Sequence, residues 1–168
     1  NGKQRGFADG IVVETKGAVL TKSAKVFEGM FEDKAKIEQS ISARIRYCMY
    51  KAKVPQYKIA KAIGYAKETI FNYMNGKVSE EHMNVQMLKK MAVYLGLDEY
   101  YFCNEYHKFI DSTDVPKLLK GTRREMGMSQ RELAAAADIP LQSYKKYEEG
   151  RVRLPEKYWR ALLDILTN

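Results

Sequence analysis

Two short segments of the chain carry side chains that can form hydrogen bonds to the edges of nucleic-acid bases. Asn72 lies in the first segment and Gln142 in the second, and both amides suit the edge of adenine. Lys145 and Lys146, also in the second segment, suit the acceptor atoms of guanine. The formal net charge is +8 at pH 7, which favours a polyanionic partner. The sequence therefore contains residue types for contact with both bases and phosphates.

These side chains belong to a repeat that covers residues 56–77, QYKIAKAIGYAKETIFNYMNGK, and residues 130–151, QRELAAAADIPLQSYKKYEEGR. The copies align without a gap. In each, the apolar spacing predicts two short helices around a sharp turn. Gly64 permits the positive φ that such a turn requires, and Gly76 ends the second helix. The matched pairs include Gln56 with Gln130, Ala60 with Ala134, and Tyr73 with Tyr147.

Further helices are predicted on both sides of each copy. Ser40 begins a helix that buries Ile45 and directs Arg44 and Arg46 away from the core. Another helix is expected over 85–95, after which Asp98 is expected to cap a short helix. In the second half, apolar spacing predicts a helix from residue 115, and Ser129 with Glu132 forms a capping box. Pro155 begins the last predicted helix.

The predicted fold class is all-α, with two tandem helix-turn-helix domains at residues 39–109 and 110–168. An N-terminal extension, residues 1–38, precedes them. Residues 11–14 and 18–21 predict a β-hairpin around Thr15-Lys16-Gly17. Lys3 and Arg5 are consistent with a basic arm that contacts DNA or with a disordered tail, and both interpretations stay open.

The sequence has no pattern typical of catalysis or metal binding. Cys48 and Cys103 are far apart, and His82 and His107 lie outside any cluster with ligand spacing, so no metal or other cofactor is expected. No motif of a nucleophile or a phosphate-binding loop occurs, so we expect no enzyme activity. No apolar run is long enough to span a bilayer and no signal peptide is recognised, so a cytoplasmic protein without membrane contact is expected.

Residues 126–150, MGMSQRELAAAADIPLQSYKKYEEG, resemble the helix-turn-helix regulators typified by lambda repressor and Cro, the XRE family. The first copy resembles this family less closely, because Pro55 stands where the family usually has Ser and Met74-Asn75-Gly76 replaces Glu-x-Gly. The resemblance implies a bacterial, cytoplasmic and nucleoid-associated transcription regulator. It also implies sequence-specific binding to double-stranded DNA, usually as a homodimer.

The resemblance assigns contact positions residue by residue. In the first copy these are Gln56, Lys67, Glu68, Thr69 and Asn72, followed by Lys77 as a phosphate contact. In the second copy they are Gln130, Leu141, Gln142, Lys145 and Lys146, followed by Arg151. Glu148 either places negative charge near the phosphates or is buried as in the family. Whether one copy or both bind DNA also stays open.

A different class of function is consistent with the same helices. Helix-turn-helix units can serve as scaffolds for dimerisation or for docking of a partner protein, with weak or no DNA binding. The aromatic residues of the first copy and the acidic end of the second copy favour this alternative. An antitoxin that binds DNA is a further option, and nothing in the sequence indicates a small-molecule effector.

Overall fold

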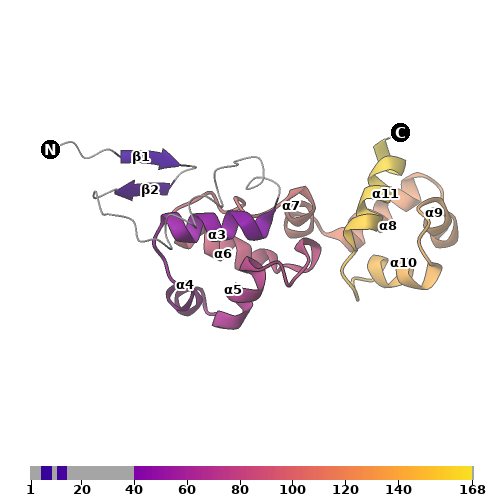
Figure 1. Ribbon diagram of the computed structural model, residues 1–168. Coiled ribbons are helices and arrows are strands. Elements are labelled where there is room, and N and C mark those ends of the chain that lie inside the picture. Colours follow the sequence, from indigo (N-terminus) through magenta and orange to yellow (C-terminus); the bar gives the residue numbers. More distant parts are fainter. Residues whose placement is uncertain (1–4, 9–10, 15–39, 168) are drawn as a thin grey trace. The chain divides into compact units, whose positions relative to one another are not determined.

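The computed structural model describes residues 5–8, 11–14 and 40–167, and the chain divides into two compact units, residues 1–104 and 105–168 (Figure 1). From residue 40 to residue 167 the chain consists of helices joined by turns, which confirms the predicted all-α class. The predicted domain boundary, between residues 109 and 110, differs from the division between these units.

Two strands near the N-terminus pair with each other. Strand β1, Arg5–Ala8, is antiparallel to β2, Ile11–Glu14, with Arg5 opposite Glu14. The predicted hairpin is therefore not confirmed: residues 11–14 form a strand, but their partner is 5–8, and residues 18–21 lie outside the described part. The sequence between the strands, Asp9-Gly10, is a pair that favours two-residue connections, and the prediction overlooked it.

The helices of the first unit pack around one apolar core. They are α3 Ile41–Lys51, α4 Gln56–Ile63, α5 Lys67–Met74, the 3-10 turn η1 Glu80–His82, and α6 Val85–Tyr94. Ile45, Ile59, Ile70 and Leu88, one from each α-helix, have no exposed surface. Burial of side chains this large contributes about 1.5–3 kcal/mol each, which holds these short helices together.

Two predictions for the first unit are wrong in detail. Arg44 was expected to point away from the core, but it is half-buried, and its guanidinium donates a hydrogen bond to the carbonyl oxygen of Tyr101 at 2.9 Å. Asp98 does not begin a helix. Its carboxylate accepts a hydrogen bond from the backbone N–H of Tyr100 at 2.9 Å, and residues 99–102 form turns.

The second unit begins with a helix that the sequence analysis missed. Its helices are α7 Glu105–Ser112, α8 Val115–Glu125, α9 Gln130–Ala136, α10 Leu141–Glu148 and α11 Glu156–Thr167. The predicted boundary falls inside α7. This helix belongs to the second unit because the Tyr106 hydroxyl donates to the carbonyl of Leu154 at 2.6 Å and its ring lies 5.6 Å from that of Trp159.

The backbone pattern of residues 40–77 recurs in residues 114–151. Helices α3 and α8 begin and end at residues that differ in number by 74, and so do α5 and α10. Positive φ angles follow the same offset. They occur at Lys53, Gly64 and Gly76 in the first stretch and at Gly127, Asp138 and Gly150 in the second. Each residue of the first stretch can therefore be compared with its counterpart in the second.

Candidate nucleic-acid interface

In the first unit, α4 and α5 are joined by a turn that requires a left-handed residue. Gly64 ends α4 with φ +77°, and its N–H donates to the carbonyl of Ala60. The N–H of Tyr65 donates to the same carbonyl at 3.1 Å. The Ala60 side chain is buried, and its small size lets the two helices approach closely. The turn thus holds α5 across α4 with Ile70 and Tyr73 facing the core.

The corresponding turn of the second unit uses aspartate where the first uses glycine. Asp138 has φ +52°, a conformation that Asp tolerates better than most residues. The N–H of Ile139 donates to the carbonyl of Ala134 at 2.8 Å. Ser129 and Glu132 form the predicted capping box at the start of α9, which is confirmed. The carboxylate of Glu132 accepts the N–H of Ser129 at 2.6 Å, and this bond lowers the pKa of Glu132.

The outward face of α5 presents several of the predicted contact residues. Lys67 and Glu68 are exposed, and their charged groups lie 4.0 Å apart. Thr69 and Asn72 are half-buried. Since none of the four is enclosed by the core, all keep polar atoms at or near the surface.

Phe71 lies on the same outward side of α5, as its helical spacing predicts, although it is not among the contact positions that the resemblance assigns. Its side chain is 43% exposed, unlike the buried Ile70 and Tyr73. The exposed Lys77 places its ammonium group 4.9 Å from the centre of the Phe71 ring. Gln56 begins α4 directly after Pro55 and is half-buried. Phe71 lies four residues after Lys67 and three after Glu68, and this helical spacing places it on the face opposite the core.

The outward face of α10 is more polar. Gln142 and Lys146 are exposed, and Lys145 is half-buried. Leu141 packs partly against the apolar core of the second unit, so only part of its side chain faces solvent. Arg151 is exposed, and its guanidinium forms an ion pair with Glu149 at 2.8 Å. A phosphate contact by Arg151 would therefore compete with this exposed ion pair.

Glu148 lies inside the second unit, which resolves the alternatives that the sequence left open for it. Two nitrogens of Arg123 donate to its two carboxylate oxygens at 2.9 and 2.8 Å. A third nitrogen of Arg123 donates to the carbonyl of Met128. The Arg123 bonds lower the pKa of Glu148 and raise that of Arg123. Glu148 therefore stabilises the junction of α8 and α10 and does not oppose phosphate at the surface.

The side chain of Gln130 is close enough to Glu148 to donate a hydrogen bond, and this bond also lowers the pKa of Glu148. Tyr144 is buried beside the pair, and burial raises the pKa of its hydroxyl. Gln130 therefore begins α9 and also contacts the buried pair of Arg123 and Glu148. The pattern of a single helix does not reveal the role of Arg123, because its partner lies 25 residues away in sequence.

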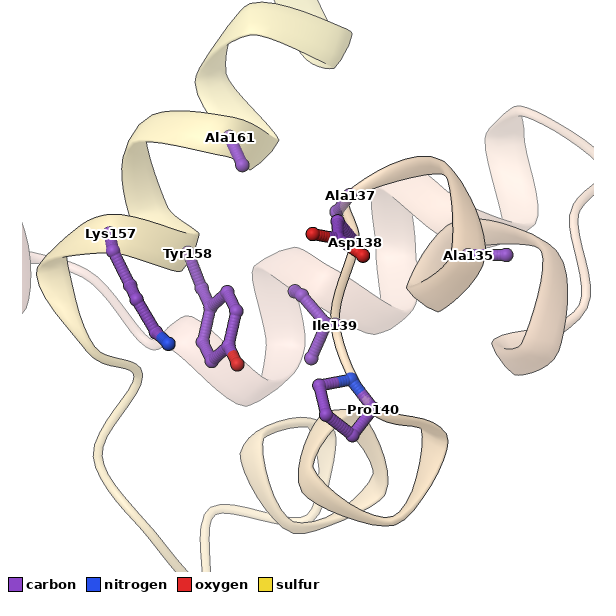
Figure 2. A pocket seen from close by; sticks show the side chains of 8 residues that line it. All are labelled: Ala135, Ala137, Asp138, Ile139, Pro140, Lys157, Tyr158 and Ala161. Carbon is purple, nitrogen blue, oxygen red and sulfur yellow. The ribbon is translucent and has the colours of Figure 1, made fainter.

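A hollow of about 600 Å³ lies behind the second turn, between that turn and α11 (Figure 2). Ile139 and Ala137 line one side, and Ala161 and Tyr158 line the other. The ammonium group of Lys157 lies 4.4 Å from the centre of the Tyr158 ring. The hollow adjoins the turn, whereas the residues expected to contact bases lie on α10, so these are separate features of the second unit.

Among the described residues, no three His, Cys, Asp or Glu side chains are arranged to hold a metal ion. Within that part of the chain, every helix is too short or too polar to cross a membrane.

A family model described as helix-turn-helix matches residues 119–166. The match includes most of α8, all of α9 and α10, and most of α11, but none of the first unit. No curated protein and no solved structure was found to match the chain. Residues 119–166 therefore carry a helix-turn-helix domain.

Proposed function

We propose that the protein is a transcription regulator that binds double-stranded DNA in a sequence-specific manner. The helix-turn-helix match in the second unit supports this function, because helix-turn-helix proteins place their second helix in the major groove. The observation that carries the proposal is the outward face of α10, where Gln142 and Lys146 are exposed and Lys145 is half-buried. In this role the protein is cytoplasmic, associates with the nucleoid and has no catalytic activity.

We further propose that the first unit is a second helix-turn-helix domain and that α5 contacts a major groove. Its support is the recurrence of helix ends and positive φ angles at an offset of 74 residues. The charge of +8 over the chain suits contact with two stretches of phosphate backbone. In this arrangement Gln56 and Gln130, at the starts of α4 and α9, lie near phosphates, with Lys77 and Arg151 following the recognition helices.

The test is binding of the full chain to a pool of random duplexes, followed by titration of a selected duplex at several salt concentrations. Each phosphate neutralised contributes about 0.9 to the slope of log affinity against log salt. Lys146→Glu and Lys67→Glu should each weaken binding, and Lys77→Ala, which removes a proposed phosphate contact, should reduce this slope by about 1. Lys108→Glu, which lies on α7 and in neither recognition helix, is the charge-matched control. Undiminished binding by both Lys146→Glu and Lys67→Glu would contradict the assignment of α10 and α5 to the groove.

A second candidate function is docking of a partner protein, including a second copy of this chain. It is supported by apolar side chains at the surface of the first unit, where Tyr57 is 66% and Val93 61% exposed. Light scattering with and without random duplex separates the two functions. A stable oligomer that is indifferent to DNA supports the docking function, whereas a complex that forms only with DNA supports the regulator.

A further inference from the structure

The two outward helix faces differ in chemistry at almost every matched position. Since α5 and α10 begin and end at residues that differ in number by 74, each outward side chain has a counterpart. Only the Thr69 and Ser143 pair keeps the same functional group. The other pairs are Lys67 with Leu141, Glu68 with Gln142, Phe71 with Lys145, and Asn72 with Lys146. Matched positions with such different donors, acceptors and apolar groups should prefer different bases.

The face of α5 suits A·T base pairs. Phe71 is 43% exposed on an otherwise polar face, and the methyl group of thymine is the apolar group that base pairs present in the major groove. Asn72 follows directly in sequence and supplies the amide that pairs with adenine. The ammonium group of Lys77 lies over the Phe71 ring. It can therefore form an ion pair with a phosphate next to this apolar contact.

The face of α10 suits a different sequence. Lys145 stands at the position of Phe71, and Lys146 at that of Asn72, so this face has no apolar ring and no amide at those positions. Ammonium groups at base edges favour the acceptors of guanine. Gln142 replaces Glu68, which removes a negative charge that would repel phosphate and puts an amide, which suits adenine, in place of a carboxylate, which suits cytosine.

We propose that the DNA site of this protein consists of two unlike half-sites. In one, α5 contacts an A·T pair with Phe71 against the thymine methyl group. In the other, α10 contacts a G·C pair through Lys145 or Lys146. This inference rests on the proposed function and adds to it the identity of the bases and a specificity-determining role for Phe71.

The first experiment selects duplexes from a random library with the full chain and then replaces each selected thymine by deoxyuridine, which lacks only the methyl group. Burial of one methyl-sized group corresponds to about a fourfold change in affinity. We expect the wild-type chain to bind the deoxyuridine duplex about fourfold more weakly at one position. Phe71→Ala should bind both duplexes equally. Because this ratio is measured within one protein preparation, partial misfolding of the variant does not change it.

The matched control is Lys145→Ala, which alters the corresponding position of α10. It should keep the preference for thymine and relax the guanine preference of the other half-site. An exchange variant, Phe71→Lys with Asn72→Lys, gives α5 the residues of α10 at two positions. It should shift the A·T half-site toward guanine and leave the second half-site unchanged.

The outcomes distinguish this inference from the function on which it rests. Recovery of two different half-sites, with thymine dependence lost in Phe71→Ala, supports it. Specific binding to one kind of half-site, or equal binding of thymine and deoxyuridine by the wild-type chain, overturns the inference but leaves the regulator function intact. Absence of any preference among duplexes overturns both.

Discussion

Replacing Arg123 by Met should destabilise the second unit strongly, because it leaves the carboxylate of Glu148 buried without its partner. The Glu148 side chain is only 5% exposed, and that of Arg123 is 15% exposed. Removal of one partner from a buried pair costs about 3–5 kcal/mol. Small domains have unfolding free energies near the lower end of about 5–15 kcal/mol. Arg123→Met should therefore remove most of the stability of this unit.

The first unit indicates how the loss can be recovered. Met49 and Met74 occupy the positions that match Arg123 and Glu148. Met49 is buried in the first core and Met74 packs against it. Substitution of a whole buried pair by apolar residues is often neutral or stabilising by about 1–4 kcal/mol. Arg123→Met combined with Glu148→Met should therefore be much more stable than Arg123→Met alone.

The double variant retains one buried polar group, the hydroxyl of Tyr144, that lowers its stability. The Tyr144 hydroxyl is buried beside the pair without a hydrogen-bond partner, and an unsatisfied buried hydroxyl costs about 1–3 kcal/mol. Ile70 stands at the matched position of the first unit. Adding Tyr144→Phe to the double variant removes this hydroxyl and should add about 1 kcal/mol or more of stability.

The assay is unfolding in urea, monitored by tryptophan fluorescence. The chain has one tryptophan, Trp159, whose ring lies 5.6 Å from the rings of Tyr106 and Phe109 in the second unit. Its emission therefore reports unfolding of that unit. Lys108→Met is the control, because it breaks an exposed ion pair with Glu105 and should cost no more than about 1 kcal/mol.

Two results would refute this reasoning. Equal stability of Arg123→Met and Lys108→Met would mean that water reaches Glu148 despite its burial. The second such result is a double variant with Tyr144→Phe that remains as unstable as Arg123→Met. The second unit would then depend on the ion pair itself and not on the volume and hydrogen bonds of the groups that fill this space.

Three further predictions concern single features of the second unit. The pKa of Glu148 in the folded state lies below its ordinary value of 4.5, so the contribution of this residue to stability is fully present above pH 4.5. This contribution should be lost as the pH falls through the lowered pKa, and urea unfolding at pH 6 and pH 3 measures the loss. Ser129→Ala removes the capping box and should cost about 0.5–2 kcal/mol in the fluorescence assay. Gly150→Ala should lower the melting temperature measured by circular dichroism, because a Cβ there would lie 3.0 Å from Pro116 at φ +70°; an unchanged melting temperature would show that the chain relaxes around the added methyl group.

Local features of the sequence were sufficient to predict most helices and both turns. Gly64 and Gly76 have the positive φ angles expected of them, and Ser129 caps α9 as predicted. These predictions succeed because caps, glycines and apolar spacing act over a few residues, so their effect is present in any short segment. Helix α7 was missed because its polar end resembles a linker, and its place in the second unit depends on Tyr106, which bonds to a residue 48 positions away.

The sequence by itself determined where the outward faces of α5 and α10 lie, since helical periodicity separates them from the buried residues. Tertiary structure decided what several side chains on or near those faces do. In the folded chain Glu148 is buried against Arg123, and Gln130 lies close to that pair. Part of Leu141 packs into the core, and Phe71 stays exposed. The physical reason is that burial and ion pairing join residues from different helices, and the distances between them are set only when those helices pack.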